Sequence, residues 1–323
     1  MQGDQCGVVT RKQALAGGLS PGTIRGHVES GRWQRLLPGV YATFTGPVPR
    51  ICRLWAAVLA AGSEAVLSHH TAAELQGLID EPVELIHVTI PARRRLRALP
   101  GIVSHTSHRA GRAAHPSRLP PQTRIEETVV DLTQTSRTVE QALGWVIRAV
   151  ARRLTTVDRL RTALAGRPKL RWRAQLLATL DDVGVGCHST LELAYVRDVE
   201  RRHGLPTAAR QTIRVRRGGR WYNDVEYTDY STIVELDGPP AHPDEARERD
   251  MRRDNAAVAS GKTLLRYGPV HIRGGPCTTA AEVATVLQRN GWRGRPKPCG
   301  PRCVIVDAIT PDSARNRPRS RSA

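Results

Sequence analysis

The chain has 323 residues, of which 40% are hydrophobic, and 49 basic against 30 acidic residues give it a net charge of +19. This length allows two or three folded domains, and no apolar run approaches the roughly 20 residues that a membrane span needs. The excess of positive charge favours a nucleic-acid partner. Because the first residues lack a charged-then-apolar leader, we expect a cytoplasmic protein.

Residues 1–49 follow the order helix, turn, helix, hairpin. Thr10 with Gln13 has the pattern of a capping box, and Ser20 before Pro21 marks the start of a second helix. Strands are predicted on both sides of a turn at 38–39. This is the order of a winged helix-turn-helix, in which the second helix reads DNA. The alternative is a small helical domain with a solvated basic face. The residues that we expect to contact DNA here are Thr23, Arg25, His27 and Arg32.

Residues 50–136 mix helix and strand, and residues 137–182 have a helical pattern. Alternating apolar residues over 84–90 and 101–106 predict two strands. Apolar stripes at helical spacing then predict a connector of three helices. No acid or cysteine stands at metal-ligand spacing from the histidines of the middle segment, so we assign them to helix caps and strand surfaces. These histidines are His69, His70, His87 and His105.

The pattern with the most specific chemistry lies within residues 183–292. Asp224 and Glu226 fall on one predicted strand, and Glu235 and Asp237 fall on the next, before His242 in a turn. Carboxylates crowded at strand ends repel one another, and a hard divalent cation relieves that repulsion. The pattern therefore indicates Mg²⁺ (or Mn²⁺) and metal-assisted phosphodiester hydrolysis.

Each acid of this pattern has an expected role. Asp224 and Glu235 would bind the cation and Asp237 would be a third ligand. His242 would serve as general base or acid, with a loop histidine as the alternative. Glu192 is either a further ligand or only the acid of a capping box that begins at Ser189. Glu235 and Asp237 share a strand face that could instead be solvated at an edge. Glu226 is treated as a surface acid, and the arginines expected to clamp phosphate or contact DNA are Arg249 and Arg253.

The cysteines are scattered, and no Cys-x-x-Cys pair recurs, so we expect free thiols and no structural zinc site. Only the last two stand close together. Residues 293–323 repeat Arg, Pro and Ser and are predicted to form a basic, disordered tail, with 303–306 as its one candidate strand. The six cysteines are Cys6, Cys52, Cys187, Cys277, Cys299 and Cys303.

The first 135 residues resemble the AbiEi-type antitoxin architecture, in which a winged-helix domain precedes a small α/β domain. The resemblance implies DNA binding or repression, and it makes a toxin a candidate partner. The matching stretches are 10–19, 20–25, 31–33, 37–41, 67–73, 87–91 and 127–132.

The C-terminal residues resemble the restriction-endonuclease-like PD-(D/E)xK superfamily, close to the very-short-patch repair endonuclease. In that superfamily a helical Glu precedes a strand with a metal-binding Asp, and the next strand carries a second acid and a catalytic Lys. Glu192, Asp224 and Glu235 match the acids, and His242 follows as in the repair endonuclease. Asp237 stands where the superfamily has its Lys. The resemblance therefore predicts the fold, whereas the missing Lys leaves open how a water would be activated.

The expected fold is a mixed α/β and α+β multidomain protein. The leading hypothesis is a DNA-binding protein with a Mg²⁺-dependent endonuclease domain. The alternatives are an antitoxin-like transcriptional regulator with an inactive nuclease fold and a partner-binding protein that does not touch nucleic acid. The predicted domains are a winged helix-turn-helix (1–49), a small α/β domain (50–136), a helical connector (137–182), a restriction-endonuclease-like domain (183–292) and the tail (293–323).

Overall fold

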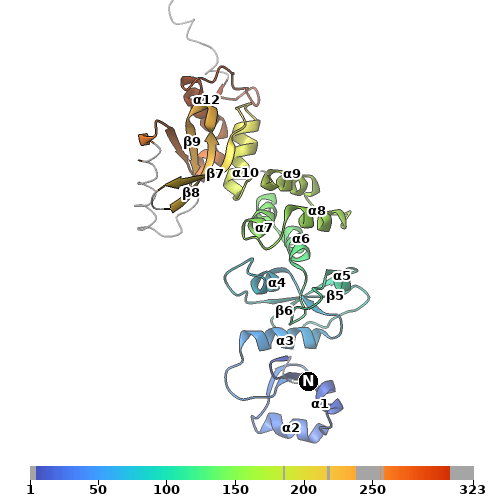
Figure 1. The fold of residues 1–323 in the computed structure, drawn as a ribbon. Helices are drawn as coiled ribbons and strands as arrows, with labels where there is room; N and C mark the ends of the chain where they lie inside the picture. The colour runs from blue at the N-terminus through green and yellow to red at the C-terminus, as the bar shows by residue number, and fades with distance from the viewer. Residues whose placement is uncertain (1–4, 185, 217–218, 238–254, 256–257, 306–323) are drawn as a thin grey trace, which may run out of the picture. The chain divides into compact units, whose positions relative to one another are not determined.

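The computed structural model describes residues 5–184, 186–216, 219–237, 255 and 258–305. The chain is a mixed α/β protein that separates into two compact units, Met1–Leu180 and Asp181–Ala323 (Figure 1). We call them the N-terminal and the C-terminal unit. Among the described residues, no helix is both long and apolar enough to cross a membrane.

The N-terminal unit begins with an antiparallel sheet of strand order β1-β3-β2. Thr10 and Gln13 exchange both hydrogen bonds of the predicted capping box at the start of α1, and the Ser20 hydroxyl accepts a hydrogen bond from the backbone N–H of Thr23 at the start of α2. The predicted order of helix, turn, helix and hairpin is therefore present. The elements are β1 (Val8–Thr10), α1 (Arg11–Ala16), α2 (Pro21–Glu29), β2 (Gln34–Leu37) and β3 (Val40–Ala42).

Helix α3 (Arg50–Ala61) is buried from two sides because its apolar residues cover most of its circumference. Cys52 and Trp55 pack in one core with the first sheet, whereas Leu54 and Val58 pack in a second core. This helix therefore joins the two sheets of the N-terminal unit (Figure 1).

The second sheet has the strand order β4-β5-β6, with β5 antiparallel to β4 and parallel to β6. Its strands confirm the two that the sequence predicts and add the short β4. Helices follow the sheet, and those that begin after Thr138 and Thr156 are capped by the threonine hydroxyls. The elements are β4 (Val66–Leu67), α4 (His69–Leu75), β5 (Ile86–Pro91), β6 (Ile102–Ser107), α5 (Ala110–Ala113), α6 (Ile125–Thr135), α7 (Val139–Ala151), α8 (Val157–Ala165) and α9 (Arg173–Gly184).

The C-terminal unit contains a mixed sheet of strand order β10-β9-β8-β7, in which only β9 and β10 are parallel. One face of the sheet is apolar and packs against the helices (Figure 1). Tyr195, Val225, Val234 and Leu287 lie in this core with almost no exposure. The elements are α10 (Thr190–Ala194), η2 (Tyr195–Arg201), β7 (Ala209–Arg216), β8 (Gly219–Tyr227), η3 (Thr228–Tyr230), β9 (Thr232–Leu236), β10 (Thr263–Tyr267), η4 (Val270–Gly274) and α12 (Pro276–Arg289).

Residues 293–305 differ from the expected disordered tail. Cys303 and Ile305 are buried in the core of the C-terminal unit, and the Lys297 N–H donates to the His203 carbonyl at 2.7 Å. The basic composition of the segment predicted disorder, because only a few apolar and sulfur side chains hold it against the core of the C-terminal unit. Residues 303–305 form no strand.

Candidate functional site

Asp224 and Glu235 lie opposite each other on neighbouring strands. Val225 pairs with Val234 in the antiparallel ladder of β8 and β9, and one further step of that register places Asp224 across from Glu235. Val225 and Val234 face the apolar core, so the two acids face the other side of the sheet. The Leu236 N–H donates to Asp224 Oδ2 at 2.9 Å and fixes that carboxylate. The structure thus brings the first two predicted metal ligands together.

Glu192 is the third residue of α10 and is buried, with 4% of its surface exposed. Its N–H donates to the Ser189 hydroxyl at 3.0 Å, and its Oε2 accepts from the His188 N–H at 2.9 Å. Burial raises the pKa of the Glu192 carboxyl, and the charge of Asp224 raises it further. Only the Ser189 half of the predicted capping box is therefore present, because the Glu192 carboxyl accepts from the residue before the N-cap. That carboxyl also interacts with the charge of Asp224.

Asp237 is engaged elsewhere. Its carboxylate accepts two hydrogen bonds from Arg266, from Nε at 2.8 Å and from Nη2 at 2.7 Å. Arg266 stands beside Glu235 in the parallel register of β9 and β10. The predicted third ligand is thus held by a cation of the protein itself.

The described acids do not form a compact ligand set. Among the described residues, the groups of at least three His, Cys, Asp or Glu whose ligand atoms lie within 4.8 Å of one another consist of histidines and cysteines. Glu192, Asp224, Glu235 and Asp237 are not such a group. The predicted residues His242, Arg249 and Arg253 lie outside the described residues.

Glu226 is not the surface acid that the sequence suggested, because it is 1% exposed. It forms an ion pair with Lys262 and accepts hydrogen bonds from Thr212 at 2.5 Å and Asn223 at 3.0 Å. Burial alone would raise the pKa of Glu226, but these donors, Lys262 foremost, lower it to about 2. The alternation of strand residues correctly predicted that Glu226 shares a sheet face with Asp224. Its partner Lys262 could not be predicted, because it stands 36 residues further along the chain.

The four residues predicted to contact DNA in the N-terminal unit divide into two pairs. The Thr23 hydroxyl is 2.8 Å from that of Ser20, and the His27 ring stacks on Trp33 with the ring centroids 5.2 Å apart. Arg25 and Arg32 are exposed. Of the four predicted residues, these two arginines are therefore the ones whose charged ends are accessible to a phosphate.

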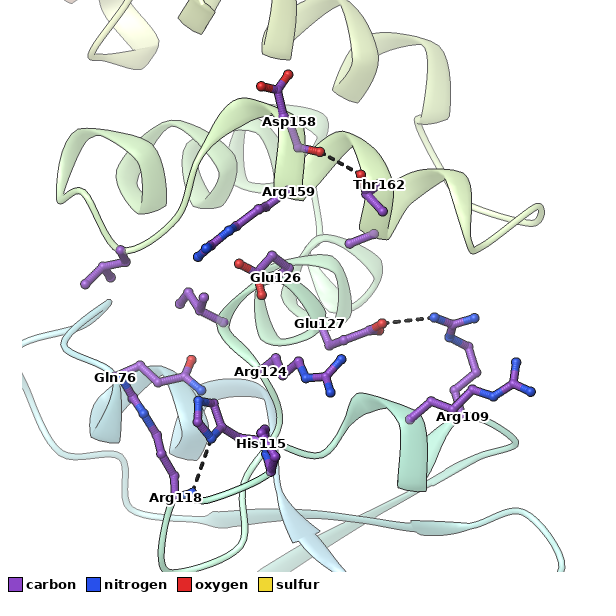
Figure 2. Close-up of a pocket in the computed structure, with 15 residues that line it drawn as sticks. Gln76, Arg109, His115, Arg118, Arg124, Glu126, Glu127, Asp158, Arg159 and Thr162 are labelled. Atoms are coloured by element: carbon purple, nitrogen blue, oxygen red, sulfur yellow. Dashed lines mark hydrogen bonds and ion pairs between the residues drawn. The ribbon is translucent and has the colours of Figure 1, made fainter.

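A basic pocket in the N-terminal unit was not foreseen. It has a volume of about 940 Å³ and lies between the loop after α5 and helices α6 and α8. Figure 2 shows Arg118 and His115 on the loop side and Arg159 on α8. The arginines that line the pocket are Arg109, Arg112, Arg118, Arg124 and Arg159.

Of the three acids that line this pocket among the described residues, Glu126, Glu127 and Asp158, one is neutralised by arginine. Glu127 is paired with Arg109 at 3.0 Å (Figure 2) and with Arg167. Glu126 accepts a hydrogen bond from Thr155 at 2.6 Å. Four further arginines of the pocket are exposed and form no ion pair within the described part of the chain, namely Arg112, Arg118, Arg124 and Arg159. The pocket therefore presents unbalanced positive charge, which suits a phosphate or another anion. These arginines come from separate segments of the chain, so no local motif marks them.

The histidines of the second sheet form a cluster. His87 Nδ1 lies 3.0 Å from His105 Nε2, and the rings of His69 and His105 stack with centroids 3.7 Å apart. Burial lowers the pKa of His69 to about 2 and that of His87 to about 4, with the neighbouring histidines adding to the effect. The sequence assigned them separately to a cap and to strand surfaces, whereas the parallel pairing of β5 and β6 brings them together.

The comparisons with known proteins add no family to this picture. No protein-family model matches the chain, and no curated protein sequence matches it.

Proposed function

We propose that the chain binds double-stranded DNA and hydrolyses its phosphodiester bonds with Mg²⁺ (or Mn²⁺) at Asp224 and Glu235. The observation that carries this proposal is the placement of these two acids opposite each other on adjacent strands. The raised pKa of Glu192 beside Asp224 supports it, because a site that disfavours a further negative charge gains from a cation.

Two protein carboxylates are enough for Mg²⁺, which keeps several waters and takes substrate phosphate oxygens as its other ligands. Asp224 and Glu235 fit this role. Asp237 is assigned a different role, because its carboxylate holds Arg266 in a two-point ion pair. A bound Mg²⁺ would lower the pKa of a water and offset charge on the phosphate.

Arg266 is proposed to supply the positive charge that the absent Lys supplies in the endonuclease superfamily. Asp237 holds the guanidinium from one side with two hydrogen bonds, and Glu235 is its neighbour in the sheet. The planar fork of N–H donors on a guanidinium matches the oxygens of a phosphate group. Its role would be to stabilise the charge that develops on the phosphate.

DNA contact is proposed for exposed arginines of the N-terminal unit. Arg25 and Arg32 lie on and after α2, and Arg118, Arg124 and Arg159 line the basic pocket. The net charge of +19 supports a polyanionic partner. These groups would supply affinity that depends on salt and not on base sequence.

A second candidate function is that of an antitoxin-like regulator that binds DNA or a toxin and does not cut. The occupation of the Lys position by Asp237, in an ion pair with Arg266, favours this candidate. It predicts salt-dependent duplex binding without strand cleavage in either Mg²⁺ or Mn²⁺.

Supercoiled plasmid incubated with the full chain separates the two candidates. The proposal predicts nicking in Mg²⁺ that EDTA abolishes and that Asp224→Asn and Glu235→Gln each reduce by about 100-fold or more. Asp229→Asn is the matched control, since Asp229 is an exposed acid in the same unit. Equal nicking by all variants would show a contaminant, and retained DNA binding without nicking would support the regulator.

A further inference from the structure

A second cluster of ligand-type side chains lies in the C-terminal unit. His203 follows η2, Cys277 is the second residue of α12, and Cys299 and Cys303 lie in the segment after that helix. One ligand atom from each of the four residues lies within 4.8 Å of the others. No local pattern marks this group, because the residues come from three separate segments and form no Cys-x-x-Cys pair.

His203 is oriented as a metal ligand. Its Nδ1 lies 3.1 Å from the Val199 carbonyl oxygen. A carbonyl can only accept, so Nδ1 carries the proton and Nε2 is left with a free lone pair. The ring is fully buried, and Nε2 has no hydrogen-bond partner within the described part of the chain. Leaving such a buried atom without a partner is unfavourable, and a bond to a metal would remove that penalty. Metal-binding histidines commonly donate their other N–H to a carbonyl in this way.

The three sulfurs lie within 4.8 Å of one another, which is close enough for them to share one metal ion. Cys277 Sγ and Cys299 Sγ are 3.4 Å apart. Four ligands at tetrahedral corners with Zn–S bonds of about 2.3 Å place their sulfurs about 3.8 Å apart, whereas a disulfide bond is only about 2.05 Å long. All six cysteines of the chain are free thiols. A disulfide between Cys277 and Cys299 would also leave Cys303 and the lone pair of His203 without a role.

The kind of donor decides the metal. Three sulfurs and one imidazole nitrogen are soft and borderline ligands, which suit Zn²⁺ and do not suit Mg²⁺ or Ca²⁺. Four protein ligands fill a tetrahedron and leave no position for substrate, as is typical of a structural zinc site. The N-terminal end of the 14-residue helix α12 adds a favourable dipole for the thiolate of Cys277.

We propose that His203 Nε2 and the thiolates of Cys277, Cys299 and Cys303 bind one structural Zn²⁺, with each thiol giving up its proton. The metal would attach residues 293–305 to the core that carries β8 and β9. The Lys297 N–H already donates to the His203 carbonyl at 2.7 Å, and Cys303 and Ile305 are buried in the same core. Zinc binding would therefore be part of the folding free energy of this unit.

Metal analysis of the full chain, purified without chelator and with any affinity tag removed, tests the proposal. We expect about one zinc per chain, and loss of the zinc in Cys303→Ser and His203→Ala proteins. Cys6→Ser is the matched control and should retain the metal, since Cys6 lies outside the cluster. Cys299→His should also retain zinc, because imidazole is an equivalent ligand, and it keeps the test valid if the serine variant fails to fold.

Cobalt substitution and proteolysis provide readouts that do not depend on DNA cleavage. The Co²⁺ protein should show thiolate-to-metal charge-transfer absorption and the intense visible bands of tetrahedral cobalt. Chelation should speed tryptic cleavage after Arg293 and Arg302, which lie in the attached segment and do not precede a proline, by about tenfold or more. A metal-free wild-type chain, a Cys277–Cys299 disulfide, or iron in place of zinc would overturn the proposal.

Discussion

Asp237 and Arg266 form a two-point ion pair at the end of β9, with Nε 2.8 Å from Oδ2 and Nη2 2.7 Å from Oδ1. Both side chains are partly exposed, so the pair is expected to add no more than about 1 kcal/mol to stability. Its main consequence is positional, because it holds a guanidinium beside Glu235 on the charged face of the sheet.

Replacing the two members of this pair should have unequal effects on DNA cleavage. Asp237→Asn should change the nicking rate by less than about threefold, because an amide oxygen still accepts from Arg266. Arg266→Gln should lower it by about 100-fold, through loss of charge stabilisation at the phosphate. Nicking rates of both variants at equal DNA occupancy check this prediction. An Asp237→Asn protein as inactive as Asp224→Asn would instead make Asp237 a metal ligand.

The buried pair of Glu226 and Lys262 should be needed for stability and not for chemistry. Lys262→Met would leave Glu226 charged and buried, which should lower the free energy of unfolding by about 3–5 kcal/mol. The double variant Glu226→Gln with Lys262→Met should recover most of that loss, because no unpaired charge remains. Urea unfolding of the single and double variants measures the coupling. Additive losses would show that the two residues do not act as a pair.

The histidine cluster should make the N-terminal unit sensitive to acid. The folded pKa of His69, about 2, lies below its ordinary value of 6.5, so between these values the unfolded chain binds a proton that the folded chain excludes. Stability is therefore fully present above pH 6.5 and is lost as the pH falls. His69 alone should account for about 2 kcal/mol between pH 7 and pH 5.

Hydrogen exchange of the β5 and β6 amides against pH measures this loss. His69→Asn is the informative variant, since Asn tolerates the positive φ of 51° at this position. It should flatten the pH dependence even where it lowers stability at neutral pH. An unchanged slope in the variant would mean that His69 does not control the acid response.

The basic pocket should contribute to DNA binding through phosphate contacts. Changing Arg118, Arg124 and Arg159 together to Ala should weaken duplex binding. The slope of log K against log salt should fall by about 0.9 for each phosphate that the variant no longer neutralises. Arg137→Ala is the control, as an exposed arginine outside the pocket. Affinity and salt slope that match those of the control would exclude the pocket from the DNA interface.

Local signals in the sequence predicted the elements well. The capping residues Thr10, Ser20 and Ser189 each begin a helix, because the hydroxyl that satisfies the first N–H groups is a property of a few adjacent residues. The period of two placed Asp224 and Glu235 on strands, and the antiparallel pairing made them neighbours.

Contacts between distant segments were beyond the same reasoning. The partner of Asp237 comes from β10, and that of Glu226 stands just before it, so neither ion pair leaves a local pattern. The cluster of His203 with three cysteines was missed for the same reason. The composition of residues 293–305 predicted disorder, whereas Cys303 and Ile305 hold this segment in the core of the C-terminal unit. Spacing rules for zinc detect ligands on short loops, whereas these ligands come from three segments.

Cleavage of a labelled DNA duplex in a single turnover, with protein in excess, tests the central claim most directly. At saturating protein, the observed rate reports the chemical step and not the affinity. We predict Mg²⁺-dependent cleavage by the wild-type chain and a loss of about 100-fold or more in the Asp224→Asn, Glu235→Gln double variant, with DNA binding unchanged. No cleavage by fully bound wild-type protein in Mg²⁺ or Mn²⁺ would contradict the account.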